Sequence, residues 1–145
     1  EGIPVFAPEH FARVSALDSM KRKQFVKGIS QLSEEGAIQT FKRPEIGREE
    51  LIVGVVGVLQ FDVLEHRLRS EYGVEIRREP LDYRFVRWID ASEGPASDLR
   101  LSSTSIVAQD RFDRDVLLFQ NEWSIRWAEE NNKGLVLADT AKATF

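Results

Sequence analysis

Two stretches with helical periodicity alternate with β-branched runs over the first ninety residues, and this order restricts the fold more than any other feature of the sequence. Over residues 18–33, apolar side chains recur three or four positions apart, at Phe25, Val26, Ile29 and Leu32. Asp18 can cap the start of this helix, because its carboxylate accepts hydrogen bonds from free backbone N–H groups. Gly36 can end it, because glycine adopts a left-handed backbone without strain.

A second helix is predicted over residues 59–72, and Gly73 is placed to end it. Its buried positions are Phe61, Val63, Leu64, Leu68 and Tyr72. Strands are predicted over residues 3–14, 37–43, 50–58, 74–78 and 83–89. The run over 50–58 carries few charges, which indicates a central place in the sheet. The order β-α-β-β-α-β, with one further strand, predicts an α+β fold: a ferredoxin-like split β-α-β antiparallel sheet with both helices on one face.

The last part of the chain, residues 91–145, has weaker patterns. A loop is expected over 91–105, followed by a hairpin, a helix capped by Asn121 and a last strand over 135–138. This part has few apolar positions and would make a weak core alone, so we expect its strands to extend the same sheet. We therefore predict a single domain over 1–145, with a ferredoxin-like half at 1–90.

Composition excludes several classes of protein. With no cysteine, the chain can form neither a disulfide nor a thiolate metal site. Its net charge of −4 disfavours a general nucleic-acid binder, although the first ninety residues hold 14 Lys and Arg against 15 Asp and Glu. No apolar run reaches the roughly eighteen residues of a membrane span, and no signal peptide is recognisable. We expect a cytoplasmic protein without a membrane partner, and the strand-like start without methionine indicates a fragment.

Motifs for nucleotide binding are absent from the sequence. There is no phosphate-binding loop, and the glycines at Gly54 and Gly57 lack the third glycine of a dinucleotide fingerprint. We expect them to let the following helix pack closely. We therefore predict no catalytic, cofactor-binding or metal-binding residues in this chain, and no enzyme activity of its own.

The two histidines are the other candidates for chemistry. His66 follows Asp62 by four residues, a spacing that suits two metal ligands on one helix face. The plainer interpretation, which we favour, is an exposed pair on the helix surface. His10 stands beside Glu9 and could act as a base, but no nucleophile with an orienting third group accompanies it.

Four cations gather at the start of the first predicted helix: Lys21, Arg22, Lys23 and Lys27, which we call the basic cluster. Such a cluster can contact a phosphate backbone without reading bases, or it can be an ordinary solvated helix face. Further candidates to extend it are Lys42, Arg43 and Arg48. Trp123 and Trp127 lie one turn apart near the C-terminus, and we expect them in the core rather than at an interface.

Longer strings carry a resemblance to a known family. They are FAPEHF at 6–11, MKRKQF at 20–25, QLSEEGA at 31–37, GVVGVLQFDV at 54–63, RL at 67–68, EYGV at 71–74 and NEW at 121–123. Together these resemble the C-terminal, third domain of bacterial peptide chain release factor three, the class II release factor. The resemblance covers nearly the whole chain and is weakest at 91–104. Ser19 departs from the proline common in the family.

This resemblance implies a function for a larger parent protein. The parent would be a translational GTPase whose nucleotide domain, absent here, binds GTP or GDP with Mg²⁺. It would drive class I release factors off the ribosome after peptide release. The domain itself would contact small-subunit RNA and protein and the other domains of its chain, and its first half would be similar to the third domain of elongation factor G. The basic cluster is our own candidate for the ribosome contact.

Two alternatives belong to other classes of protein. Ferredoxin-like folds also serve as small-molecule-sensing regulatory domains, and the glycine-containing strand end at 54–57 is the only sequence support for that function. A small hydrolase using His10 or His66 is the third hypothesis.

Overall fold

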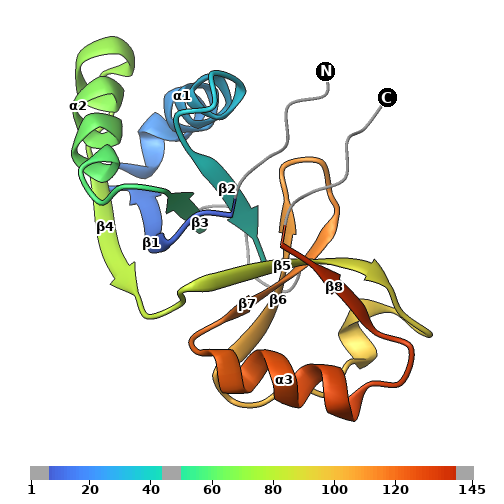
Figure 1. The fold of residues 1–145 in the computed structure, drawn as a ribbon. Coiled ribbons are helices and arrows are strands. Elements are labelled where there is room, and N and C mark those ends of the chain that lie inside the picture. Colours follow the sequence, from blue (N-terminus) through green and yellow to red (C-terminus); the bar gives the residue numbers. More distant parts are fainter. Residues whose placement is uncertain (1–6, 44–49, 140–145) are drawn as a thin grey trace.

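The computed structural model describes residues 7–43 and 50–139, and their elements follow the predicted order (Figure 1). The helices are α1 (Arg22–Glu34), α2 (Gln60–Tyr72) and α3 (Glu122–Asn131), with short 3₁₀ turns at η1 (Ser19–Lys21) and η2 (Ala96–Asp98). The strands are β1 (His10–Ala16), β2 (Gln39–Lys42), β3 (Glu50–Val55), β4 (Ile76–Leu81), β5 (Phe85–Ala91), β6 (Ser105–Asp110), β7 (Asp115–Phe119) and β8 (Val136–Ala138).

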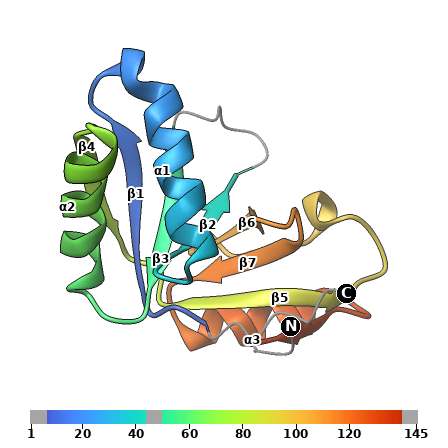
Figure 2. The same cartoon turned by 90° about the horizontal axis from the view of Figure 1, so that it is seen from above.

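These strands form one antiparallel sheet in the order β4-β1-β3-β2-β6-β7-β5-β8. The first four positions have the order of a ferredoxin-like sheet, and α1 and α2 cover one face of them (Figure 2). The predicted α+β fold is therefore confirmed, with β3 in the interior of its half. The assignment of residues 1–145 to a single domain stays a prediction.

The two halves of the sheet meet at a narrow seam. Strands β2 and β6 pair through Phe41 with Asp110 and through Lys42 with Gln109. An ion pair of 2.6 Å between the Lys42 ammonium and the Asp113 carboxylate crosses the same boundary. Few backbone pairs therefore join the two halves of the sheet, and side-chain contacts supply the rest of their contact.

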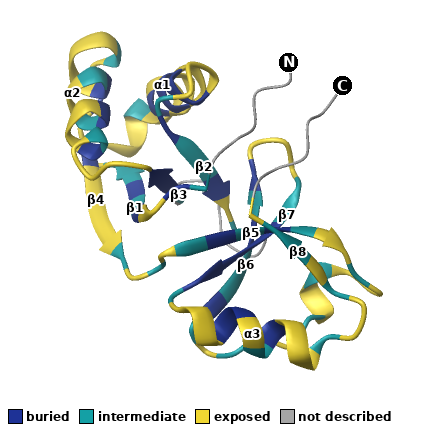
Figure 3. Ribbon diagram, viewed as in Figure 1, coloured by how far each residue is buried: buried dark blue, intermediate teal, exposed yellow. Residues whose placement is uncertain are grey.

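Three apolar cores hold the layers together (Figure 3). The first lies between α1, α2 and the sheet, and includes Phe25, Leu32, Val53, Leu64 and Leu68. The second joins both halves of the sheet, with Phe11, Phe41 and Ile52 from one half and Trp88, Val116 and Leu118 from the other. The third lies under α3 and includes Leu117, Phe119, Ile125 and Ala128. Side chains of β7 enter the second and third cores from alternate positions, so this strand is buried on both faces.

Local signals for helix ends are confirmed. The Asp18 carboxylate accepts a hydrogen bond of 3.0 Å from the backbone N–H of Met20 and begins η1, which leads into α1. Gly36 and Gly73 have φ angles of 83° and 67°, the left-handed conformation that ends each helix.

The buried stripes of the two helices differ from prediction at two valines. Val26 and Val63 are 50% and 51% exposed, so placing them in the stripes was wrong. The buried face of α1 includes Gly28 instead, which has no side chain and lies against Leu68 and Tyr72 of α2. With Phe25, Gly28 and Ile29 on the buried face of α1, Val26 lies on the side that faces solvent.

Strand β4 runs further than predicted. The segment 79–82 was expected to be a turn, but β4 continues to Leu81, and Pro80 lies opposite Ala12 of β1. This is possible because β4 is at the edge of the sheet, where proline's missing N–H removes no ladder hydrogen bond. The next strand, β5, consequently begins at Phe85.

Gly54 permits a close approach from a side that was not expected. A Cβ atom built there would lie 2.7 Å from Pro8 and 3.1 Å from the Phe11 ring. Its neighbours Val53 and Val55 belong to the core beneath the helices, so Gly54 faces the opposite side of the sheet. The expected contact with the following helix was therefore wrong, and the glycine makes room for the segment that leads into β1.

Arg67 of α2 ties the two helices together. Its guanidinium donates hydrogen bonds to the carboxylates of Glu35, at the end of α1, and Glu71, one turn along α2, at 2.6 to 3.2 Å. These hydrogen bonds lower the pKa of both carboxyls below the ordinary value of 4.5. A carboxyl with a lowered pKa in the folded state adds stability above pH 4.5, which is lost as the pH falls through the folded pKa.

Replacing this arginine tests the linkage. In Arg67→Met, we expect the pKa of Glu35 and Glu71 to rise toward the ordinary value, and the loss of stability below pH 4.5 to become shallower. Carboxyl ¹³C NMR titration measures the first effect, and urea unfolding at several pH values the second. Arg69→Met, which removes a longer pair of 3.7 Å to Glu65, is the matched control. An unchanged titration of Glu35 in Arg67→Met would contradict the expectation.

Candidate functional site

The basic cluster occupies η1 and the first turns of α1. Arg22, Lys23 and Lys27 are exposed, Lys21 is half-buried, and the neighbouring Met20 is 87% exposed. Among the residues that the structure describes, no carboxylate lies within 4.0 Å of any of these four cations. The sequence therefore places four charges close together without neutralising them locally.

The position of these charges on the helix is unfavourable. The N-terminal end of a helix carries partial positive charge, so each cation there costs about 0.3–1 kcal/mol. No acidic residue stands in the first turn of α1, and Lys21 at its N-cap makes no side-chain capping hydrogen bond. Helix stability does not explain this arrangement. Residues that lower the stability of their own helix are expected where a surface serves a function.

Several other cations of the chain have structural partners. Arg13 pairs with Glu79, Arg78 with Asp62 and Glu65, and Arg114 with Asp110. Lys42 was a candidate to extend the basic cluster, but its ammonium pairs with Asp113 at the seam. Arg43 is half-buried, and Arg48 lies outside the described residues. None of these three cations is therefore added to the basic cluster, which keeps its four members.

Asp62 and His66 are both exposed on α2, as expected, but the Asp62 carboxylate interacts with Arg78. The Asp62 carboxylate accepts a hydrogen bond from the Arg78 guanidinium at 3.2 Å, and His66 is exposed. Within residues 7–43 and 50–139, no three side chains of the metal-ligating kinds come together. Arg78 also lies 5.7 Å from the centre of the Phe61 ring, so Asp62 serves a contact between α2 and β4.

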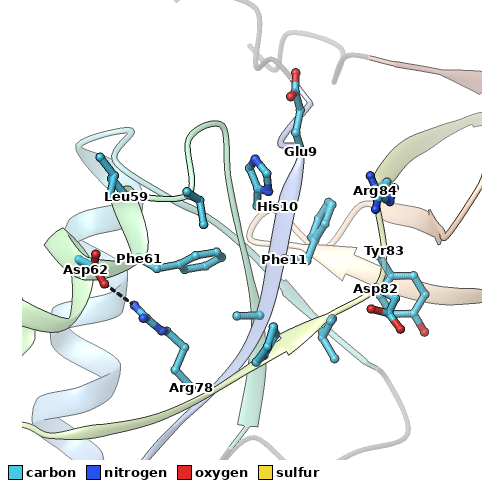
Figure 4. A pocket seen from close by; sticks show the side chains of 14 residues that line it. Glu9, His10, Phe11, Leu59, Phe61, Asp62, Arg78, Asp82, Tyr83 and Arg84 are labelled. Carbon is cyan, nitrogen blue, oxygen red and sulfur yellow. Dashed lines mark hydrogen bonds and ion pairs between the residues drawn. The ribbon is translucent and has the colours of Figure 1, made fainter.

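His10 lies at the rim of a cleft of about 540 Å³ between the start of β1, α2 and the β4–β5 connection (Figure 4). Leu59 and Phe61 lie on one side of this cleft, and Asp82 and Tyr83 on the other. Burial raises the pKa of the Tyr83 hydroxyl, and the nearby charges of Arg43 and Arg13 oppose that effect. Among the described lining residues there is no serine, threonine or cysteine to serve as the nucleophile of a hydrolase.

The two C-terminal tryptophans are not in the core, so that prediction was wrong. Trp123 is 55% exposed and Trp127 is half-buried, with their ring centres 6.5 Å apart. The buried face of α3 carries Ser124, Ile125 and Ala128. Small side chains let the helix lie close to the sheet, while Asn121 fixes its start by accepting a hydrogen bond from the Ser124 N–H at 2.8 Å.

A group of hydroxyls joins α3 to the loop before β6. The Ser124 hydroxyl, fully buried, contacts those of Ser102 and Thr104 in the loop before β6. This network could not be predicted from the sequence, because serine and threonine in a loop rarely indicate burial. The only available signal was the Asn121 cap, which fixes the first turn of the helix.

Comparison with known proteins assigns the chain to a family. The family model described as "Class II release factor RF3, C-terminal domain" matches residues 1–129. The chain belongs to this family. It is 48% identical over 143 residues to peptide chain release factor 3 of Symbiobacterium thermophilum, covering 99% of this chain and 27% of that protein. Similar relatives with the same name come from Staphylococcus carnosus (45% identity, 90% and 24% covered) and Listeria monocytogenes (45%, 94% and 26%).

The matched class II release factors are much longer than this chain. The chain spans about a quarter of the length of the curated relatives that it matches. In the described part of the chain, no helix is both long and apolar enough to cross a membrane.

Proposed function

We propose that this domain docks a translation-termination factor on the ribosome, and that the basic cluster contacts small-subunit RNA and protein. The support is the combination of family membership with four cations, three exposed and Lys21 half-buried, that no carboxylate of the described residues neutralises. Lys21 and Arg22 stand at the start of α1, where cations are least favourable. The parent protein would be a GTPase that binds GTP or GDP with Mg²⁺ outside this chain and releases class I release factors. The domain itself would have no catalytic role, and the parent would act in the cytoplasm.

Phosphate contacts by such a cluster position a protein on RNA without reading its sequence. Each neutralised phosphate releases counterions, so the affinity falls steeply with salt. A chain with a net charge of −4 would be repelled by RNA elsewhere on its surface, which restricts docking to the basic face.

Charge reversal tests this proposal. In the full-length protein, replacing all four residues of the basic cluster with glutamate is expected to weaken ribosome binding at low salt by roughly tenfold or more. Alanine at the same positions is expected to reduce the slope of log affinity against log salt by about 3, at about 0.7–0.9 per lost contact. Ribosome pelleting over a salt series measures both effects. Unchanged affinity of the glutamate variant would contradict the proposal.

A matched pair of double variants separates local from general charge effects. Lys23→Glu with Lys27→Glu changes the cluster, whereas Arg126→Glu with Lys133→Glu makes the same change of charge around α3. Only the first pair should reduce affinity for the ribosome.

In the isolated domain, Lys21→Glu and Arg22→Glu should stabilise the fold by about 0.3–1 kcal/mol each, because a negative side chain is favourable at a helix N-terminus. Weaker binding by a more stable variant would exclude unfolding as its cause.

A further inference from the structure

The connection between β3 and α2 exposes a group of apolar side chains. Four residues within eight positions form what we call the apolar loop patch: Val56, Val58, Leu59 and Val63, with exposed fractions of 55%, 58%, 72% and 51%. Leu59 and Val63 are one helical turn apart, which places them on the same side of α2. Single exposed apolar residues are ordinary, whereas four on one loop and the helical turn after it are a candidate contact surface.

This patch is held in place by hydrogen bonds. The side-chain carbonyl of Gln60 accepts from the backbone N–H groups of Val56 and Gly57 at 3.0 and 3.1 Å. The Gln60 N–H in turn donates to the Gly57 carbonyl at 3.0 Å. The backbone is therefore closed into a tight turn, and its valine and leucine side chains are fixed outward. A preformed surface binds a partner with little further loss of conformational entropy.

The patch continues into the cleft described above. Val58, Leu59 and Phe61 line one side of this space of about 540 Å³, and Figure 4 places Leu59 at its outer edge. His10 and Glu9 stand at the mouth of the cleft. A partner segment that packs on the apolar loop patch could therefore extend into this concave, partly polar cleft. Specific interfaces combine an apolar centre with a polar rim in the same way.

The chain itself brings a partner to this position. The backbone N–H of Glu9 donates to the Val55 carbonyl at 3.0 Å, so the segment leading into β1 lies directly beside the loop. The matching family model is a C-terminal domain, and the match covers only 27% of the Symbiobacterium relative. The rest of the polypeptide therefore precedes this domain in the family. A domain joined to this segment by a short connection would be held near the patch at high effective concentration.

We propose that the apolar loop patch is the surface on which the preceding part of the same polypeptide packs. Its contact would bury Leu59 and the three valines, and would fix this domain relative to the rest of the protein. The proposal requires membership of the family but not ribosome docking by the basic cluster, so the two can fail independently.

Because the chain has no cysteine, a single thiol introduced into the apolar loop patch can be labelled selectively in this domain. Leu59→Cys places a thiol in the patch, and Met20→Cys places a control thiol at another exposed position, beside the basic cluster. In the isolated domain, both should react rapidly with iodoacetamide. In the full-length protein, Leu59→Cys should react about tenfold more slowly or slower still, because a thiol in a contact reacts only when the contact opens. Peptide mass spectrometry reads the rate at each site.

Three outcomes would overturn the proposal. The first is equal reactivity of Leu59→Cys in the domain and in the full-length protein, together with rapid labelling of Met20→Cys in both. The second is protection that increases with protein concentration, which would assign the patch to a second copy of the chain. The third is protection that arises only when ribosomes are added. Protection of Met20→Cys by ribosomes would support the basic cluster separately, whatever happens at Leu59.

Discussion

Replacing Asp110 with alanine is expected to destabilise the fold by about 3 kcal/mol, because hydrogen bonds to a charged group contribute about 1.5–3 kcal/mol each and Asp110 accepts several. Asp110 is buried, and its carboxylate accepts four hydrogen bonds of 2.9–3.0 Å. The donors are the Trp88 indole, the Arg114 guanidinium, and the backbone N–H groups of Phe112 and Arg114. Without Asp110 the indole N–H stays buried and unpaired, and the β6–β7 turn loses its internal acceptor.

Urea unfolding of a double-mutant cycle measures the central contact. Trp88→Phe keeps a ring in the second core and removes the N–H, so it should cost less in the Asp110→Ala background than in the native chain. We expect a coupling energy of about 1–2 kcal/mol, within the range for residues in direct contact. Additive losses would show that the indole and the carboxylate do not depend on each other.

The position of Asp110 makes its loss more than a local effect. It is paired with Phe41 at the seam, where only two residue pairs join β2 to β6 among the described residues. Hydrogen exchange in Asp110→Ala should therefore accelerate first in β6 and β7, before the helix-covered half of the sheet. Equal acceleration in both halves would contradict this role at the seam.

Features that depend on near neighbours were predictable from the sequence. Asp18, Gly36, Gly73 and Asn121 each fix a helix end through one or two residues nearby, and each is found as expected. The alternation of these helices with β-branched runs then predicts the ferredoxin-like order. The exposure of Arg22, Lys23 and Lys27 was also predictable, because they lie on the polar side of one helix. Their role in binding stays a prediction.

Features that depend on distant segments were not predictable. Asp110 looked like one charge among several in a hairpin turn, and its burial follows from Trp88, twenty-two positions away. Trp123 was expected in the core for its size, yet the small residues of α3 face the sheet. Val58 was expected to end a strand and Leu59 to begin a helix, but the strand ends at Val55, and the Gln60 side chain holds the turn after it through the N–H groups of Val56 and Gly57. In each case the deciding partner is a tertiary contact or a side-chain hydrogen bond that periodicity does not encode.

A side chain at Gly28 is expected to force α1 away from α2. A Cβ atom there would lie 2.5 Å from the Leu68 side chain and 3.0 Å from the Tyr72 ring. Leu68 is fully buried and cannot move aside without disturbing the first core. Overpacking of this kind costs about 1–3 kcal/mol, more than the roughly 1 kcal/mol that alanine gains over glycine in a helix. We expect Gly28→Ala to lose about 1 kcal/mol net, and the larger Gly28→Val about 3 kcal/mol or more.

Thermal unfolding of matched variants tests this helix crossing. Ser30 is exposed in the middle of the same helix, so Ser30→Ala should be neutral or slightly stabilising, and Ser30→Val should change stability little. A loss of 3 kcal/mol in Gly28→Val should lower the melting temperature by roughly 6–12 °C for a chain of this size. Leu68→Ala removes the obstructing atoms, so combining it with Gly28→Ala should cost less than the sum of the two single changes. If Gly28→Ala instead stabilised the domain as much as Ser30→Ala, the helices could not be in close contact there. The basic cluster, whose Lys27 directly precedes Gly28, would then not be positioned by this helix crossing.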